Sequence, residues 1–252
     1  MLRHALAALF IAGLARQAVA AELTVFCPGA VRATVTALAR DFERASGNTV
    51  KLEYGTAGAV QKRVAAGEPF DVAITTSGAV DELTKQGRIA AGSKRDIGSV
   101  GVGVAVRSGA AMPDISTPAA FRQAMLNARS VMYADPAKGG QSGIHTAHVF
   151  ETLGIAEQMK PKTQLRPGAP EGLGEVAKGD IDIGLGQVSE IVAAQGVTLV
   201  GPYPGELQNT LVFSAGVSAA ARAPDAAQAF VAALVSPDAR ARFKAAGFDV
   251  RP

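Results

Sequence analysis

Residues 135–154, DPAKGGQSGIHTAHVFETLG, bring a serine and two histidines to the point where turn-forming residues give way to a helical pattern. Ser142 and His145 are the residue types of a nucleophile and its general base. The glycines at 139, 140 and 143 can let the backbone approach a ligand closely. The unpaired N–H groups of a helix start also attract anions. The stretch therefore allows two kinds of chemistry, hydrolysis by Ser142 and anion binding by the backbone.

Neither histidine completes a known catalytic or metal-binding pattern. The nucleophile-elbow pattern G-x-S-x-G is interrupted, because Ser142 is followed by Gly143 and Ile144. His145 and His148 are spaced i, i+3 and could ligate a metal, but no third ligand is near them in the sequence. We therefore predict no metal and no cofactor. A serine-dependent hydrolase that uses Ser142 and His145 remains the alternative to a binding protein.

The first twenty residues have the pattern of a cleaved signal peptide. Arg3 gives a positively charged start, residues 5–14 form an apolar run, and Ala18 and Ala20 form a small-x-small cleavage site. The apolar run is shorter than the about 20 residues that span a bilayer. We therefore predict that residues 1–20 are removed and that the mature protein is exported to the periplasm.

Composition limits the class of partner. The precursor has 252 residues, a formal charge of +3, no Trp and 5% aromatic residues. Removing residues 1–20 removes Arg3 and Arg16 and no acid, so the charge of the mature chain falls to +1. Such a chain has neither the basic excess nor the stacking aromatics of a nucleic-acid-binding protein, so no nucleic-acid partner is expected. Cys27 is the one cysteine, so no internal disulfide can form, and its place at a strand end predicts a buried side chain.

Strand and helix patterns alternate along the first third of the chain. Strand patterns at residues 22–26, 49–54 and 71–76 are each followed by a turn of small residues, CPGA, GTAG or TTSG, and then by a helical pattern. Three such units predict a parallel sheet with helices on its faces. Ligands of such sheets lie beyond the carboxyl ends of the strands, where these turns gather.

A second set of strand and helix patterns lies between two long extended stretches, residues 100–109 and 209–218. A chain that leaves one lobe, builds a second and returns needs two crossings, and these stretches are the candidates. The sequence thus predicts an α/β fold of two lobes, each a mostly parallel sheet flanked by helices, joined by two hinge strands. The predicted bounds are residues 21–104 and 213–252 for lobe 1 and residues 105–212 for lobe 2. We expect closure on a ligand by rotation about Val104–Ala105 and Val212–Phe213.

Four segments carry a resemblance to a known family. They are residues 23–89, beginning LTVFCPGA, then YADPAKGGQSGIHTAHVFETLGI at 133–155, GDIDIGLGQVSEIV at 179–192 and AFVAALVSPDARARFKAAGF at 229–248. In this order and spacing they resemble the periplasmic molybdate-binding proteins of ABC importers, which have the type II periplasmic solute-binding fold. The resemblance covers essentially the whole mature chain. It implies a monomer without catalytic activity that captures a small anion between its lobes and delivers it to a membrane permease.

The resemblance also indicates ligand-binding positions. Members of that family hold their oxyanion with serine hydroxyls at the first two helix N-termini, backbone amides and a tyrosine of the second lobe. The matching positions here are Ala30, Ala57, Ser142 and Gln187, so two hydroxyls are replaced by methyl groups and the tyrosine by an amide. These replacements favour an organic carboxylate over a molybdate-type oxyanion. The predicted ligand-binding residues are Gly29, Ala30, Ala57, Gly58, Ser77, Gly140, Gln141, Ser142, Gly143, His145, Gly172 and Gln187.

Overall fold

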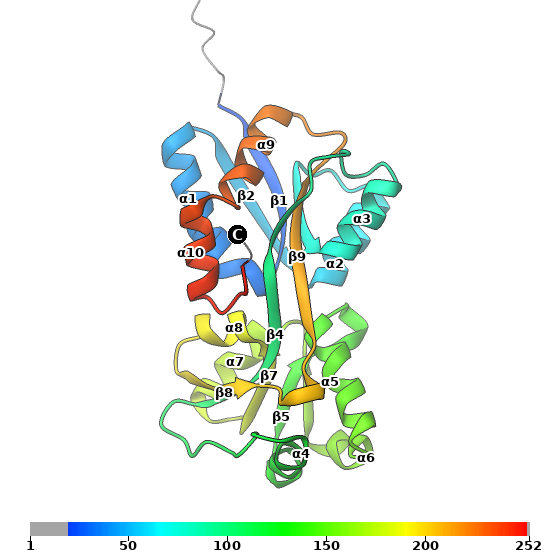
Figure 1. The fold of residues 1–252 in the computed structure, drawn as a ribbon, viewed down its shortest axis with the longest axis vertical. Coiled ribbons are helices and arrows are strands. Elements are labelled where there is room, and N and C mark those ends of the chain that lie inside the picture. The colour runs from blue at the N-terminus through cyan, green and yellow to red at the C-terminus, as the bar shows by residue number, and fades with distance from the viewer. Residues whose placement is uncertain (1–19, 251–252) are drawn as a thin grey trace, which may run out of the picture.

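The computed structural model describes residues 20–250, which form two lobes stacked along the long axis of the molecule (Figure 1). Two strands run side by side from one lobe to the other, β4 (Arg95–Arg107) and β9 (Thr210–Val217). They include most of the two stretches predicted as crossings. Residues 1–19, which hold all but the last residue of the predicted signal peptide, lie outside the described residues.

Lobe 1 contains the first three strands, six helical segments and parts of β4 and β9. Its strands are β1 (Glu22–Pro28), β2 (Thr49–Gly55) and β3 (Val72–Thr76). Its helical segments are η1 (Gly29–Val31), α1 (Arg32–Ser46), α2 (Ala57–Ala66), α3 (Ser77–Lys85), α9 (Pro224–Ala233) and α10 (Pro237–Ala245). The β1, β2 and β3 units confirm the three strand–turn–helix repeats that the sequence predicts.

Lobe 2 contains the remaining strands and helices. Its strands are β5 (Val131–Ala134), β6 (Thr163–Arg166), β7 (Ile183–Gln187) and β8 (Val197–Pro202). Its helical segments are α4 (Pro118–Asn127), η2 (Pro136–Lys138), α5 (Gln141–Thr152), α6 (Ala156–Met159), η3 (Lys160–Lys162), α7 (Ala169–Lys178), α8 (Val188–Ala193) and η4 (Gly205–Leu207).

The sheet order shows how the lobes are joined. Among residues 20–250 one path of strands runs β2-β1-β3-β9-β4-β7-β5-β6, with β8 paired to β4. The pairs β1–β2, β1–β3, β5–β6 and β5–β7 are parallel, whereas β9 and β4 are antiparallel to their neighbours. This arrangement confirms the predicted α/β fold of two mostly parallel, helix-flanked sheets. The lobe bounds and the rotation about Val104–Ala105 and Val212–Phe213 stay predictions.

The side chains of β1 show why lobe 1 has helices on both faces of its sheet. Leu23, Val25 and Cys27 belong to one buried apolar cluster, and Phe26 belongs to another on the opposite face. Successive strand residues point to opposite faces, so a strand apolar at consecutive positions must be covered on both sides. Cys27 is fully buried, as predicted, and burial raises the pKa of its thiol.

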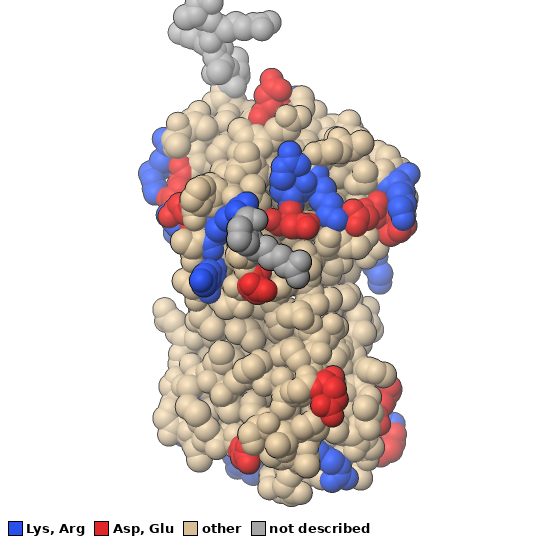
Figure 2. Space-filling model, viewed as in Figure 1, with Lys and Arg blue, Asp and Glu red and all other residues tan. Residues whose placement is uncertain are grey.

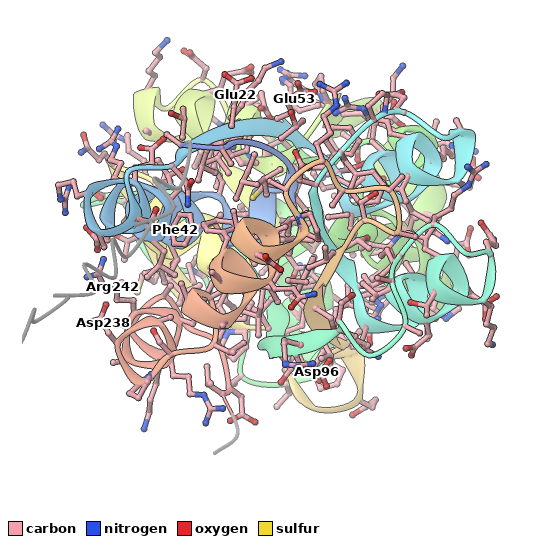
Figure 3. All side chains as sticks on the ribbon, turned by 90° about the horizontal axis from the view of Figure 1, so that it is seen from above. Glu22, Phe42, Glu53, Asp96, Asp238 and Arg242 are labelled. Carbon is pink, nitrogen blue, oxygen red and sulfur yellow. The ribbon has the colours of Figure 1, made fainter. Side chains whose placement is uncertain are left out.

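The C-terminal helices return to lobe 1 and pack against its first helix. Arg242 of α10 lies beside Asp238 of the same helix (Figure 3), with Nη2 2.9 Å from the carboxylate. Its Nη1 lies 2.7 Å from Asp41 of α1. Phe42 of α1 packs edge-on against Phe230 of α9, with ring centroids 5.2 Å apart. These contacts bind the last segment of the chain to the first lobe.

Charged side chains of both signs are intermixed over lobe 1 on the face in Figure 2, and they are sparse over the waist between the lobes. This face therefore presents no extended basic surface. No helix within residues 20–250 has the length and apolar character needed to cross a membrane.

Candidate ligand-binding site

A cavity of about 200 Å³ lies between the lobes. The N-terminal residues of several helical segments form its wall, those of η1 and α2 from lobe 1 and those of α5, α7 and α8 from lobe 2. This volume is below the about 300 Å³ at which drug-sized pockets begin. The cavity therefore suits a small metabolite or inorganic ion.

The lobes touch each other around this cavity. Gly58 N–H of lobe 1 donates to the carbonyl oxygen of Gly139 of lobe 2 at 3.2 Å. Ser189 Oγ of lobe 2 donates to the carbonyl oxygen of Ala30 at 2.7 Å. The structure thus shows the lobes closed on each other.

Seven of the twelve predicted site residues line the cavity, and five do not. The cavity-lining residues are Gly29, Ala30, Ala57, Gly140, Gln141, Ser142 and Gln187, and the others are Gly58, Ser77, Gly143, His145 and Gly172. Ser77 begins α3 outside the cavity. Ala30 and Ala57 line the cavity with methyl side chains, at the positions where the resemblance implies hydroxyls.

Two of the remaining glycines allow close packing within lobe 2. A Cβ atom on Gly143 would lie 1.7 Å from the carbonyl oxygen of Ala134 at the end of β5. A Cβ atom on Gly172 would lie 2.0 Å from Met132 Cε. These glycines let α5 and α7 approach the sheet, which gives them a packing role away from the cavity. Gly58 instead contacts Gly139 across the lobes.

His145 faces a backbone carbonyl rather than the cavity. Its Nε2 lies 2.7 Å from the carbonyl oxygen of Leu207, and its ring lies 6.0 Å from that of Tyr203. Ser142 lines the cavity and is buried. The contact with Leu207 holds the imidazole away from the role of general base to Ser142. The arrangement therefore favours the binding hypothesis over the serine-dependent hydrolase.

The helix starts at the cavity offer backbone N–H groups to an anion. Gly140 and Gly168 are the N-caps of α5 and α7, and glycine has no side chain with which to cap these helices. By contrast, the Thr56 side chain accepts a hydrogen bond from Ala59 N–H at 3.1 Å and caps α2. Uncapped helix starts keep unpaired donors and a partial positive charge. The N-termini of α5 and α7 therefore present unpaired backbone N–H groups at the cavity.

Arg32 brings a full positive charge to the cavity, although it is not among the residues predicted from the sequence. It is the first residue of α1, lies over the ring of Tyr54 at 4.4 Å from the centroid, and comes within 3.8 Å of Glu171 of lobe 2. Its Nε is buried without a hydrogen-bond partner among residues 20–250. Arg32 comes two residues after the turn CPGA and directly after η1, so only this position in the sequence could have pointed to it. A guanidinium group in this position can donate to an anionic group.

Two polar side chains of lobe 2 complete the wall. Gln187 is 3% exposed and forms a capping box with Glu190 at the start of α8. Glu190 Oε2 accepts a hydrogen bond from Gln187 N–H at 3.0 Å. Burial raises the pKa of Glu190 to about 7, helped by the nearby Glu171 carboxylate and opposed by the Gln187 N–H and Arg32. The cavity thus holds a cation, an amide and a carboxyl group that titrates near neutral pH.

We expect Glu190 to make stability fall as the pH rises. Its folded pKa of about 7 exceeds the ordinary value of 4.5, so the folded protein binds more protons than the unfolded chain between these values. The contribution to the free energy of unfolding is therefore fully present below the lower value and is lost as the pH rises through the upper one. Urea unfolding of the wild type and Glu190→Gln at several pH values measures this contribution as their difference. A difference that does not change with pH would contradict the expectation.

Comparison with known proteins places the chain in a family. The protein-family model described as "Bacterial extracellular solute-binding protein" matches residues 23–249 of the chain. A relative from a Pseudomonas species, named aconitate isomerase, is 33% identical over 238 residues, which cover 91% of this chain and 88% of the relative. The periplasmic molybdate-binding protein of Azotobacter vinelandii superposes with a TM-score of 0.77 at 19% identity, over 91% of this chain and 100% of that structure.

The sulfate-binding protein SubI of Mycobacterium tuberculosis H37Rv superposes with a TM-score of 0.67 at 19% identity, over 90% of this chain and 86% of that structure. These two structures share the fold, and they confirm the resemblance to the molybdate-binding proteins at that level. The family match spans both lobes and all the cavity-lining residues described above. The chain therefore belongs to the family of bacterial extracellular solute-binding proteins.

Proposed function

We propose that this protein captures a small organic anion with two or more carboxylates in the cavity between its lobes. The observation that carries the proposal is the convergence of Arg32 and several helix N-termini on one cavity of about 200 Å³. A cation and backbone donors together bind carboxylates well. Several separate donors around one cavity suit a ligand with more than one carboxylate.

The remaining polar groups favour an organic anion over molybdate. Ala30 and Ala57 offer no hydroxyl donors, each of which contributes about 1.5–3 kcal/mol when it bonds to a charged group. Gln187 offers an amide that can donate and accept, and Glu190 offers a carboxyl that can donate when it is protonated. The relative named for aconitate, a tricarboxylate, supports the same ligand class.

Calorimetric titration of the ligand-stripped protein tests the ligand class. We expect cis-aconitate, trans-aconitate or a related polycarboxylate to bind at least about a hundredfold more tightly than molybdate or sulfate, because two lost hydroxyl donors cost molybdate about that much. Nanomolar binding of molybdate would show that the backbone donors alone are sufficient to bind this oxyanion, and it would contradict the proposal.

We further propose that the protein works in the periplasm as a monomer and delivers its ligand to the membrane permease of an ABC importer. The family and the two-lobed fold support this role.

The proposed export leaves Ala21 as the first residue, and intact mass of the periplasmic protein would identify that terminus. A mass that includes Met1 would exclude cleavage.

Closure should be visible in solution. We predict that the ligand-free lobes open by rotation about Val104–Ala105 and Val212–Phe213, because β4 and β9 join the lobes. The pairing register of β4 with β8 shifts between Val104 and Ala105, which is an irregularity at the predicted hinge. Small-angle scattering should give a smaller radius of gyration with saturating aconitate than without it. Identical profiles would count against hinge closure.

The Gly58–Gly139 contact allows a matched test of closure. A Cβ atom on Gly58 would lie 2.9 Å from both Cα and the carbonyl oxygen of Gly139, so Gly58→Ala should obstruct the closed state. Overpacking costs about 1–3 kcal/mol, and we expect aconitate binding to weaken by about tenfold or more. Gly78→Ala is the control, because Gly78 is also the second residue of its helix and has no described atom within 4 Å of its added Cβ. Equal affinities in calorimetry would show that this contact does not limit closure.

A second candidate function is isomerisation of the captured anion. Two observations favour it, the relative named aconitate isomerase and the presence of the Glu190 carboxyl in the cavity wall. Capture and isomerisation need the same cavity and the same class of ligand. They differ in whether a C–H bond of the ligand breaks there, which can be measured directly.

A further inference from the structure

Glu190 places a carboxyl group in the cavity, and capture of an anion does not require this group to ionise there. Its Oε2 is fixed by Gln187 N–H, and a Cβ atom on Gly29 would lie 2.5 Å from Oε1. Gly29 belongs to lobe 1 and Glu190 to lobe 2, so the closed lobes hold the carboxyl between them. An ionised carboxylate at this place repels an anionic ligand. A carboxyl group that exchanges its proton with the ligand has a use there.

We propose that Glu190 transfers a proton between two carbon atoms of a bound unsaturated polycarboxylate. The inference rests on the second candidate function above. The groups that would hold such a ligand surround Glu190: Arg32 from the start of α1, Gln187 from the end of β7, and the N-termini of α5 and α7. They come from both lobes, so the site is complete only when the lobes are closed.

The proposed step conserves atoms and electrons. The Glu190 carboxylate takes a proton from the methylene carbon that lies between a carboxylate group and the carbon–carbon double bond. The electron pair of that C–H bond forms a new double bond, and the pair of the old double bond forms a C–H bond with the proton that Glu190 returns. One C–H bond breaks and one forms, so the step needs no oxidant or reductant. It can convert one geometric isomer of the ligand into the other.

The surroundings of Glu190 suit both halves of this step. The charged groups that face it are Arg32 from α1 and Glu171 from α7, which lie 3.8 Å apart. Burial brings the pKa of Glu190 to about 7, where one carboxyl group can both take and return a proton near neutral pH. Negative charge that spreads over the ligand between the two transfers is stabilised by Arg32 and by the helix N-termini.

The test follows aconitate in D₂O with the full-length mature chain. Proton NMR reports exchange of the methylene hydrogens and interconversion of the cis and trans isomers, and calorimetry reports binding separately. The variants are Glu190→Gln, which keeps the shape and an oxygen that can accept from Gln187 N–H, and Glu190→Asp, which keeps the acid. The control is Glu151→Gln on the exposed side of α5, which removes a charge outside the cavity.

We expect the wild type and Glu151→Gln to exchange and isomerise aconitate at equal rates. The rate in Glu190→Gln should fall by about a hundredfold or more, as for loss of a general acid–base group, while aconitate still binds. Glu190→Asp should recover part of the rate with a shifted pH profile. In the wild type the rate should rise as the pH approaches about 7, because the ionised form starts the reaction.

Three results would overturn the inference, and they differ in what they leave standing. Equal rates in the wild type and Glu190→Gln would assign proton transfer to another group. Binding of aconitate by the wild type with neither exchange nor isomerisation would leave capture as the function and remove catalysis. Failure of the wild type to bind either isomer would count against the proposed ligand class itself.

Discussion

Replacement of Arg32 by methionine should weaken the binding of aconitate by about tenfold to a hundredfold. A hydrogen bond to a charged group contributes about 1.5–3 kcal/mol, and about 1.4 kcal/mol corresponds to a factor of ten in affinity. Arg32 lines the cavity, and its Nε has no hydrogen-bond partner within residues 20–250, so we expect the guanidinium group to pair with a ligand carboxylate. Calorimetry of the variant and the wild type measures the loss.

The fold should tolerate this replacement. Arg32 and Glu171 side chains are 37% and 45% exposed, and the Nη2–Oε1 distance is 3.8 Å, so their ion pair contributes little to stability. The stem of methionine keeps apolar contact with the Tyr54 ring. The affinity of Arg32→Lys for aconitate should lie between those of the wild type and Arg32→Met. Lysine keeps the positive charge but lacks the planar guanidinium group that can form two parallel hydrogen bonds.

Arg40→Met is the matched control for the Arg32 variants. Arg40 lies on α1 as well, but it is exposed and does not line the cavity. The same change of charge there should leave the affinity for aconitate unchanged. If Arg32→Met and Arg40→Met bind aconitate equally well, Arg32 does not contact the ligand.

Replacement of Gly143 by alanine should destabilise the fold and remove ligand binding together. The added Cβ would lie 1.7 Å from the carbonyl oxygen of Ala134 and 2.7 Å from its carbonyl carbon, and both are backbone atoms that no side-chain rotation can clear. Overpacking costs about 1–3 kcal/mol of stability. We expect Gly143→Ala to lose about 3 kcal/mol or more, because α5 must move away from β5. A loss of this size lowers the melting temperature of a chain of this length by about 2–4 °C for each kcal/mol.

Ligand binding should fall with it, because Gln141 and Ser142 at the start of α5 line the cavity and would move with the helix. Gly174→Ala on α7 is the control, and we expect it to change stability in the opposite direction. Gly174 is exposed inside its helix, and no described atom lies within 4 Å of its added Cβ. Alanine there should raise stability by about 0.5–1 kcal/mol. Urea unfolding of both variants checks the pair, and a Gly143→Ala protein as stable as the wild type would contradict the packing explanation.

The sequence by itself determined the fold and pointed to the general position of the candidate site. The alternation of strand, small-residue turn and helix requires a parallel sheet with helices on its faces, and a sheet of this kind gathers its turns at one edge. The stretches predicted as crossings overlap β4 and β9. Seven of the predicted residues line the cavity because they lie at or next to the starts of helical segments or at the end of β7, which meet at this edge of the sheet.

Only the tertiary structure decided which side chains complete the site. Arg32 and Glu190 are ordinary charged residues of helices in the sequence, and only the closed lobes bring the Glu190 carboxyl against the backbone of Gly29. The sequence around a turn glycine does not show whether a ligand, a strand or the other lobe packs against that glycine. Gly143 contacts β5 and Gly58 contacts the other lobe, because those approaches depend on elements far away in the chain. The local pattern specifies where a helix starts, and the long-range packing specifies what that start touches.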